Sequence, residues 1–476
     1  MILKRIYDDL LSQTSYLLGC EKTGIAVVID PNRESERYVA EAEQEKLKIS
    51  FVTETHIHAD FVSGARSLAR ATGAELLLSA EGGNDWSYRF AQSDGARLVR
   101  DGDTFDVGRI RLQVLHTPGH TPEHICFLVT DTTVSQCPLG LVSGDFIFVG
   151  DVGRPDLLEK AAHVAGTADT LARQLFHSIR ATSNLGDYLQ VWPGHGAGSA
   201  CGKGLGAMPS TTLGYERLVN WAFQISNEDD FVRAALTDQP EPPPYFARMK
   251  QINRDGPPLA LPSEPLREVT AVELRDAIAA KACVIDARST ADFSASHIPG
   301  TLSVPMGTSF ATWAGWLVPE NRDIIILADN LGRVARARHA LSLIGLDRVV
   351  GRAGAETRDE WRRTIGPLES VALTTAVDVA DDHTRTLIDV RRDTEWNAGH
   401  APQAVHRFLG TLLDGMRDTP KDEPIAMHCQ GGTRSGIASA LLQANGYTNV
   451  MNMKDGFDGW TAAGLPIESS GNHTAH

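Results

Sequence analysis

Histidine and aspartate side chains follow four separate apolar runs in the first half of the chain, in types and spacings that suit a metal ion. His56 and His58 stand two residues apart directly after one of these runs, so in an extended chain both imidazoles face the same side. His120, Asp145 and His195 each follow another apolar run further along. Imidazole and carboxylate ligands suit Zn, Fe or Mn. The sequence therefore predicts a metal site built at four strand ends.

A cysteine near the C-terminus belongs to a second reactive pattern. Cys429 ends an apolar run, and Gly431, Gly432 and Arg434 follow it before a run of helical composition at 436–445. Successive backbone N–H groups in such a loop, and the positive end of the helix dipole, cradle an anion. Arg434 adds positive charge that favours a thiolate. We therefore predict that Cys429 is a catalytic thiol supported by Arg434.

The elements that must position these side chains are short strands and amphipathic helices. Apolar, β-rich runs predict strands, and a periodicity near 3.6 residues predicts helices between them. In the first half, strands are expected at 24–30, 49–53 and 75–79, helices at 34–48 and 61–71, and hairpins between 97 and 129. The fold class is therefore expected to be α/β.

Proline-rich stretches and an internal repeat divide the chain. Prolines cluster at 240–244 and again at 256–265, where helices and sheet ladders are interrupted. Beyond them, two short apolar runs end in Asp-x-Arg, at Asp286 and Asp389, and each has a histidine eleven residues later. The last two domains are therefore expected to be copies of one α/β unit. The three domains are expected at 1–260, 265–367 and 371–476.

Composition excludes several classes of protein. The chain has 476 residues, which fits two to four domains of ordinary globular composition. Its net charge of −15 argues against nucleic acid or an anionic membrane as a partner, because both bind basic surfaces. Six scattered cysteines without a CxxC pair argue against a disulfide scaffold. With no apolar leader or membrane span in the sequence, we expect a cytoplasmic protein.

The N-terminal half resembles the metallo-β-lactamase fold, an αββα sandwich, over about residues 1–250. The resemblance rests on the motif His56-x-His58-x-Asp60, the histidine of TPGHT, and the later aspartate and histidine. Hydrolases of this superfamily carry HxHxDH and bind two zinc ions, but the last position here is Phe61, whose ring cannot bind a metal. The set that remains is two histidines and one carboxylate, which suits non-haem Fe(II) and O₂.

Within this superfamily the region looks like a persulfide dioxygenase, the mononuclear iron branch. The similarity implies one Fe(II) per chain, with His56, His120 and Asp145 as its ligands. It also implies neighbours that orient the ligands or water. These neighbours are His58, Asp60 and His195.

Two further residues near these motifs have more than one interpretation. Arg154 lies in GDVGRPD, which is similar to a stretch near the thiol substrate in persulfide dioxygenases. Its partner is either a substrate carboxylate or Asp156. Cys201 lies six residues beyond His195 in a glycine-rich loop. It is either a relay for sulfane sulfur or an incidental, partly exposed thiol.

The C-terminal repeat resembles the rhodanese sulfurtransferases. Cys429 and Arg434 stand in the loop that carries the sulfur in that family, with Asp-x-Arg and His400 before it and GFDGW after it. The first repeat has Asp329 where the second has Cys429. Because a carboxylate cannot carry sulfane sulfur, the first repeat is expected to be inactive, as a spacer or docking surface.

The resemblances together imply a persulfide dioxygenase–rhodanese fusion that acts in sulfide detoxification. The iron site would oxidise a low-molecular-weight thiol persulfide with O₂ to sulfite. Cys429 would join sulfite and sulfane sulfur as thiosulfate, or catalyse the reverse reaction. The sequence leaves open the identity of the thiol, the direction of sulfur transfer and whether the chain forms a homo-oligomer.

The competing interpretation is a dinuclear zinc hydrolase of thioesters that resembles glyoxalase II. His58, Asp60 and His195 favour it, since they stand where such hydrolases have metal ligands. Phe61 and the fused rhodanese-like domains oppose it.

Overall fold

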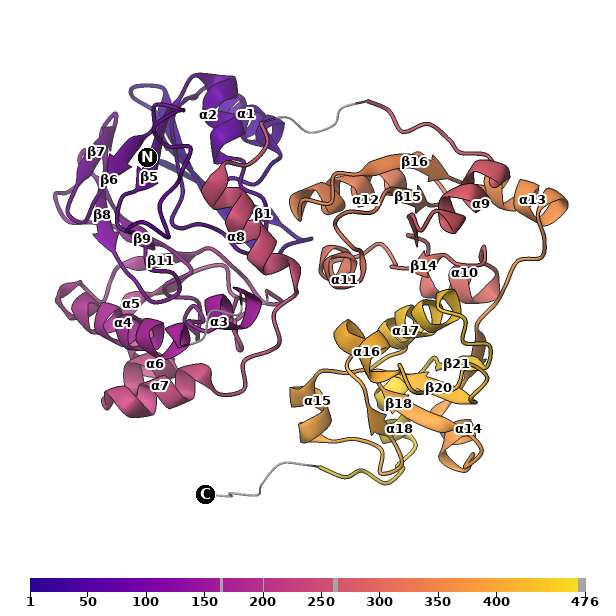
Figure 1. The fold of residues 1–476 in the computed structure, drawn as a ribbon. Coiled ribbons are helices and arrows are strands. Elements are labelled where there is room, and N and C mark those ends of the chain that lie inside the picture. Colours follow the sequence, from indigo (N-terminus) through magenta and orange to yellow (C-terminus); the bar gives the residue numbers. More distant parts are fainter. Residues whose placement is uncertain (163–165, 200, 260–263, 470–476) are drawn as a thin grey trace. The chain divides into compact units, whose positions relative to one another are not determined.

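The structure is a computed structural model that describes residues 1–162, 166–199, 201–259 and 264–469. Its contacts divide the chain into two compact units (Figure 1). Unit 1 comprises Met1–Pro262 with Ser342–Gly345, and unit 2 comprises Ser263–Leu341 and Leu346–His476. Among the described residues, no helix has both the length and the apolar composition needed to cross a membrane.

Two six-stranded sheets form the centre of unit 1. The first contains, in spatial order, β1 (Ile2–Asp8), β2 (Gln13–Cys20), β3 (Ile25–Ile29), β4 (Lys48–Thr53), β5 (Glu75–Ser79) and β6 (Arg97–Val99). The second contains, in spatial order, β7 (Thr104–Val107), β8 (Ile110–His116), β9 (Ile125–Asp131), β10 (Gly140–Gly144), β11 (Gln190–Pro193) and β12 (Thr211–Thr212). In both sheets the order in space follows the order in the chain.

Side chains that alternate along these strands contribute to three separate apolar cores. In β2, Leu18 contributes to the core between the two sheets, whereas Leu17 contributes to the core on the other face of the first sheet. In β9, Phe127 lies between the sheets and Leu128 lies on the outer face of the second sheet. Helices cover both outer faces, so the expected αββα sandwich is confirmed.

The helices of unit 1 are short and follow the strands that they cover. Those on the first sheet are α1 (Ser35–Gln44) and α2 (Ala65–Thr72). The others are α3 (Leu157–Ala162), α4 (Thr167–Ala181), α5 (Leu213–Val219), α6 (Trp221–Gln224), α7 (Glu228–Leu236) and α8 (Tyr245–Asp255).

Unit 2 contains two separate parallel sheets. The first is ordered β14-β13-β15-β16, from β13 (Cys283–Asp286), β14 (Leu302–Ser303), β15 (Ile324–Leu327) and β16 (Val349–Ala353). The second is ordered β17-β21-β20-β18-β19, from β17 (Ala372–Thr374), β18 (Thr386–Asp389), β19 (Val405–His406), β20 (Ile425–His428) and β21 (Val450–Met453). Strand–helix–strand crossovers connect the strands, as parallel pairing requires.

Ten α-helices and one short 3-10 helix, Leu409–Thr411, accompany these two sheets within the described residues. Those of the first repeat are α9 (Ala271–Ala279), α10 (Thr290–Ala295), α11 (Phe310–Leu317), α12 (Leu331–Leu343) and α13 (Ala355–Thr364). Those of the second are α14 (Ala376–Ala380), α15 (Asp393–Ala398), α16 (Leu412–Gly415), α17 (Thr433–Ala444) and α18 (Gly456–Ala462).

The sequence repeat is also visible in matching contacts. Arg288 Nη2 donates to Asp286 at 2.6 Å, and Arg391 Nη2 donates to Asp389 at 2.7 Å. The histidine eleven residues beyond each aspartate then donates from Nδ1 to a carbonyl oxygen four residues before it, at 2.9 Å in both copies. Asp-x-Arg and the histidine therefore fix the segment after the first strand of each repeat, and their role is structural.

The observed elements differ from the expected ones at several ends. The hairpin of β1 and β2 was not predicted, and the helix expected at 61–71 begins only at Ala65. The residues before Ala65 form a loop instead. Asn253 of α8 donates from its amide to the carbonyl oxygens of His58 and Phe61, at 2.8 and 2.7 Å. These hydrogen bonds hold the backbone of the loop in a non-helical path.

Candidate metal centre and thiol site

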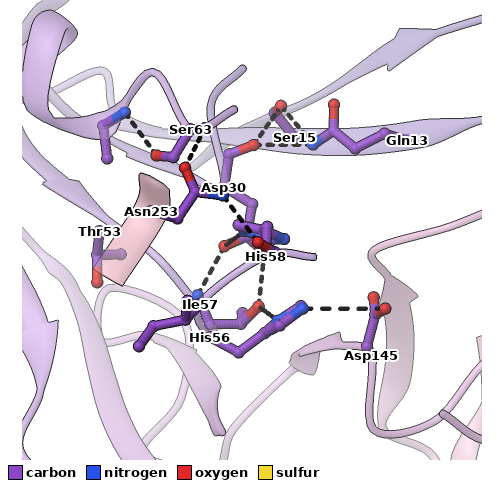
Figure 2. Close-up of polar contacts among 12 residues, drawn as sticks. Gln13, Ser15, Asp30, Thr53, His56, Ile57, His58, Ser63, Asp145 and Asn253 are labelled. Carbon is purple, nitrogen blue, oxygen red and sulfur yellow. Dashed lines mark hydrogen bonds and ion pairs between the residues drawn. The ribbon is translucent and has the colours of Figure 1, made fainter. Parts of the chain in front are cut away.

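Three side chains from three different loops of unit 1 converge on one point. His56 follows β4, His120 lies between β8 and β9, and Asp145 follows β10. Asp145 Oδ2 lies 3.5 Å from His120 Nε2 and 3.9 Å from His56 Nε2, as Figure 2 shows for His56. All three side chains are buried, and neither His56 Nε2 nor the Asp145 oxygens have a hydrogen-bond partner. Such an orphaned, convergent set fits a metal ion.

Hydrogen bonds on the far side of both imidazoles direct their lone pairs toward this point. Thr55 Oγ1 donates to Asp30 Oδ2 at 2.9 Å, so it accepts the hydrogen on His56 Nδ1, also at 2.9 Å. His120 Nδ1 donates to the carbonyl oxygen of Arg154 at 3.1 Å. Burial holds the pKa of His56 well below its usual range and also lowers that of His120. Both rings are therefore neutral, which is the form that binds a metal.

His58 lies beside this set but turns away from it. Its Nε2 is 3.2 Å from Asp30 Oδ1 (Figure 2). The ring of Phe61 packs on the His58 ring, with centroids 4.4 Å apart. Burial alone lowers the pKa of His58, but the Asp30 carboxylate outweighs it and raises that pKa to about 9. His58 is therefore a cation paired with Asp30, which also accepts the backbone N–H of Thr55 at 2.6 Å.

His124 orients the carboxylate of the set and was not among the predicted site residues. Its Nε2 accepts the backbone N–H of Asp145 at 3.1 Å, and its Nδ1 donates to Thr117 Oγ1 at 2.9 Å. Burial holds the pKa of His124 well below its usual range, so the ring stays neutral and keeps this acceptor. A signal was present in the sequence, since His124 follows TPGHT closely.

The structure corrects the interpretation of Arg154 as a residue that binds substrate. Its guanidinium is fully buried and donates to both carboxylate oxygens of Asp156, at 2.9 and 2.7 Å. The charge is already compensated, so the side chain has no face left for a substrate carboxylate. Its contribution to the centre is the backbone carbonyl that orients His120.

Asp60, His195 and Cys201 form a second group next to the first. One ligand atom of each lies within 4.8 Å of the others, and all three side chains are buried. Cys201 is 1% exposed, so the interpretation as a partly exposed thiol is wrong. Burial raises the pKa of this thiol well above its usual range, and the neighbouring Asp60 adds to the shift. Without a cation beside it, Cys201 is therefore a thiol and a poor nucleophile.

The structure places Cys429 in the loop between β20 and the N-terminus of α17. The side chain is 1% exposed, and Ser435 Oγ donates to its Sγ at 3.4 Å. Backbone N–H groups at the start of α18 bind the loop from the other side, since Phe457 donates to the carbonyl oxygen of Cys429 at 2.7 Å. Ser435 was not predicted, although its hydroxyl lies in the same motif as Arg434.

Arg434 has a partner that the sequence did not reveal. Its Nη1 and Nη2 donate to the two carboxylate oxygens of Glu395 at 2.6 and 2.7 Å. A bidentate pair of this kind fixes the guanidinium plane. It also compensates much of the charge that Arg434 was expected to offer Cys429. The structure therefore makes Glu395 part of the loop's electrostatics, 39 residues away in the sequence.

Gly432 shapes the loop, and we expect Gly432→Ala to destabilise it. Gly432 has φ +88°, and a Cβ there would lie 2.1 Å from the carbonyl oxygen of Lys454. Gly446 is the matched control, because it has φ +86° but an added Cβ meets nothing within 4 Å. Gly446→Ala should cost about 1–2 kcal/mol of unfolding free energy, and Gly432→Ala about 3 kcal/mol or more. Thermal unfolding measures both, and equal costs would contradict the role of the Lys454 contact.

The sheet register places Ala328, and not Asp329, at the position of Cys429. Leu327 ends β15 and pairs with Asp286, as His428 ends β20 and pairs with Asp389, so Ala328 and Cys429 are the residues that directly follow. The expected equivalence of Asp329 and Cys429 is therefore wrong by one residue. Ala328 is buried and carries no sulfur, whereas the exposed Asp329 accepts a hydrogen bond from Arg333 Nη1 at 2.7 Å.

Comparisons with known proteins agree with the two folds. Residues 8–195 match the profile of the metallo-beta-lactamase superfamily, and residues 270–353 and 374–463 match that of the rhodanese-like domain. A solved metallo-beta-lactamase from Staphylococcus aureus subsp. aureus COL is 42% identical, with a TM-score of 0.67, and covers 74% of this chain and 99% of its own. The chain therefore belongs to the metallo-beta-lactamase superfamily and carries two rhodanese-like domains after that domain.

Relatives of two different activities match the N-terminal region. A hydroxyacylglutathione hydrolase from Polaromonas sp. is 29% identical over 53% of this chain and 98% of its own length. The mitochondrial persulfide dioxygenase ETHE1 of Homo sapiens is 27% identical over 41% of this chain and 68% of its own length. The comparisons therefore support an enzyme with a metal site and rhodanese-like domains, and they leave the metal and the reaction to be argued from the residues.

Proposed function

We propose that the N-terminal domain is an iron-dependent persulfide dioxygenase and that the C-terminal repeat is a sulfurtransferase. The first reaction is RSSH + O₂ + H₂O → RSH + SO₃²⁻ + 2H⁺, in which the outer sulfur loses four electrons and O₂ gains them. The second transfers sulfane sulfur between a persulfide, Cys429 and sulfite, with no net oxidation. The observation that carries the proposal is the set of His56, His120 and Asp145, together with the turn of His58 away from it.

That set fits a mononuclear iron site better than the first site of a dinuclear hydrolase. The hydrolase pattern places the histidine at position 58 on a metal, but His58 here is ion-paired to Asp30. Two histidines and one carboxylate leave open positions for O₂ and a persulfide. Bound to this set, Fe(II) would supply the redox chemistry that activates O₂. Thr55, His124 and the Arg154 carbonyl fix the orientation of its ligands.

Cys429 is proposed to act as the nucleophile of the second reaction. Its thiolate attacks the outer sulfur of a persulfide, the S–S bond breaks, and the parent thiolate leaves. Sulfite then attacks the outer sulfur on Cys429, and thiosulfate leaves as the Cys429 thiolate is restored. Ser435 Oγ is placed to donate a hydrogen bond to that thiolate in both steps. Both directions use the same groups, so substrate concentrations set the net direction.

Metal analysis with activity assays separates this proposal from the hydrolase alternative. The alternative, a dinuclear zinc thioesterase resembling glyoxalase II, is favoured by the second group of buried ligands and by the hydroxyacylglutathione hydrolase relative. We expect about one iron per chain and O₂ uptake that depends on added persulfide. Two zinc ions per chain, with hydrolysis of S-lactoylglutathione and no O₂ uptake, would establish the alternative instead.

The first repeat is proposed to have no part in sulfur transfer, and we expect Asp329→Ala to show this. The substitution removes the carboxylate paired with Arg333 at the surface, and such changes usually alter stability by less than about 0.5 kcal/mol. The rate of thiosulfate-to-cyanide sulfur transfer should stay within about twofold of the original. A loss of tenfold or more would contradict an inactive first repeat.

Three predictions from the sequence remain proposals of the same kind. The domain limits at 1–260, 265–367 and 371–476 are proposed as the boundaries at which limited proteolysis would cut. The relay of sulfane sulfur through Cys201 is proposed only for states in which that thiol is ionised, because burial keeps it protonated otherwise. Low-molecular-weight thiol persulfides, O₂, sulfite and thiosulfate are the proposed substrates and products.

A further inference from the structure

A buried glutamate of unit 1, Glu123, contacts the loop that carries His56. It follows His120 by three residues in the connection between β8 and β9, and it is 0% exposed. Its Oε1 accepts the backbone N–H of Ile57 at 2.7 Å. Ile57 stands directly between His56 and His58 in the chain. A side chain from the His120 loop therefore holds the backbone of the His56 loop.

This contact matters because His56 and His120 belong to different sheets. His56 follows β4 of the first sheet, whereas His120 lies between β8 and β9 of the second. Strand pairing within one sheet does not fix the distance between their imidazoles, whose ring centroids lie 4.9 Å apart. Contacts that connect the two sheets must therefore set that distance.

Two further hydrogen bonds between the sheets fix the backbone around Glu123. Ser79, at the end of β5, donates from its hydroxyl to the carbonyl oxygen of Glu123 at 2.7 Å. Ile125, at the start of β9, donates its backbone N–H to the carbonyl oxygen of Thr55 at 2.8 Å. The carboxyl group of Glu123 therefore reaches Ile57 from a backbone that is itself held in place.

The Glu123 carboxyl group serves as a hydrogen-bond acceptor and not as a charge. Its Oε2 has no hydrogen-bond partner among the described residues. Burial raises the pKa of Glu123 to about 7, although the N–H of Ile57 acts in the opposite direction. A carboxyl group can accept the N–H of Ile57 in its protonated and in its ionised form. The contact therefore depends on the position of the oxygen.

We propose that Glu123 is a positioning residue of the metal centre, which acts through the N–H of Ile57 to hold His56 at its distance from His120. Groups that orient metal ligands from behind change metal affinity or activity about 10–100-fold when they are lost. The inference concerns the set of His56, His120 and Asp145 whichever metal it binds. It rests on the proposed function only where O₂ uptake is measured.

Two substitutions separate the reach of this side chain from its charge. Glu123→Asp keeps the carboxylate but shortens the side chain by one carbon–carbon bond, about 1.5 Å, so its oxygen no longer reaches the N–H of Ile57. Glu123→Gln keeps the length and an oxygen that can accept this hydrogen bond, but it carries no charge. If position is what matters, the glutamine variant should behave as the unsubstituted chain.

The test measures binding of Co²⁺ to the metal-free, full-length chain in competition with a chelator. The visible spectrum of bound Co²⁺ reports the arrangement of its ligands, which a loss of fold stability alone would not change. We expect Glu123→Asp to weaken binding of the first Co²⁺ at least about tenfold and to change this spectrum. Glu123→Gln should stay within about threefold of the unsubstituted affinity and keep the spectrum. Persulfide-dependent O₂ uptake with Fe(II) should follow the same order.

Glu216→Asp is the matched control. Glu216 is also 0% exposed, and its Oε2 accepts the backbone N–H of Gly150 at 2.9 Å. Its Oε1 likewise has no hydrogen-bond partner among the residues that the structure describes. Gly150 is not adjacent in the chain to any of the three ligands. Glu216→Asp should therefore leave the affinity for Co²⁺ and its spectrum unchanged, even if the Tm of the metal-free chain falls.

Co²⁺ binding that is unchanged in Glu123→Asp, or weakened equally in Glu216→Asp, would overturn the proposal. A loss of about tenfold in Glu123→Gln would also overturn it, since the charge would then be what the centre needs. The glutamine variant therefore decides the question even if Glu123→Asp does not fold. Co²⁺ binding does not depend on the reaction, so O₂ uptake by the unsubstituted chain reports on the dioxygenase proposal separately.

Discussion

Cys429→Ser is expected to abolish sulfurtransferase activity while the N-terminal domain continues to consume O₂. The substitution keeps the size of the side chain and its contact with Ser435, which lies 3.4 Å from Sγ, but a hydroxyl cannot form a persulfide. Loss of a covalent nucleophile removes on the order of 10³-fold or more of the rate. Thiosulfate-to-cyanide sulfur transfer should therefore fall to background.

Two readouts make this prediction specific. With a persulfide and O₂ as substrates, the variant should release sulfite in place of thiosulfate at an unchanged rate of O₂ uptake. Cys137→Ser serves as the control for cysteine loss at an exposed position and should behave as the unsubstituted chain. If Cys429→Ser kept its sulfurtransferase activity, the thiol of the reaction would have to be another one.

Much of the metal set was predictable because its residues belong to simple local patterns. Runs rich in apolar residues form β4, β8 and β10, of which β10 is buried throughout and β8 alternates between buried and exposed residues. His56, His120 and Asp145 each follow one of these strands within a few residues. The loops that follow these strands lie at the same edge of the sandwich, so the side chains that they carry come close together. The same logic located Cys429 between β20 and α17.

The first hairpin was not predictable from composition. All eight residues of β2 are buried, yet its first three are Gln13, Thr14 and Ser15. A polar stretch of this kind predicts a loop. These residues can be buried in a strand only because tertiary contacts satisfy the hydrogen-bonding groups of their side chains. Gln13 Nε2 and Ser15 Oγ both donate to the carbonyl oxygen of Asp30, at 2.8 and 2.7 Å. Such partners are invisible until the fold exists.

The partners of several charged or buried side chains were also not predictable from the sequence. The sequence left open whether Arg154 pairs with a substrate carboxylate or with Asp156. The structure shows a buried ion pair with Asp156. Arg434 pairs with Glu395 across 39 residues, and Cys201 reaches Asp60 from a glycine-rich loop that has no periodicity to read. Periodicity predicts which face of an element is buried, but it does not predict which loops meet.

The largest effect on the first reaction is expected from Asp145→Asn. The amide has the shape of the carboxylate, but it carries no charge. Its oxygen is a weaker ligand and its nitrogen cannot bind a metal, so the set loses its one anionic ligand. Metal bound after dialysis should fall at least about tenfold, and persulfide-dependent O₂ uptake about 10²-fold or more. His177→Gln, at a histidine whose side chain is 69% exposed, is the matched control and should keep both.

Thermal unfolding separates loss of the metal from damage to the fold. A bound ion stabilises the native state by an amount that grows with its concentration relative to Kd, about 2.7 kcal/mol at a hundredfold excess. A chelator should therefore lower the Tm of the unsubstituted chain and of His177→Gln, but leave that of Asp145→Asn unchanged. In the metal-free state, Asp145→Asn should match or exceed the original in Tm, because the orphaned Asp145 carboxylate is costly without its ion. A large fall in Tm for metal-free Asp145→Asn would instead assign the residue a role in the fold.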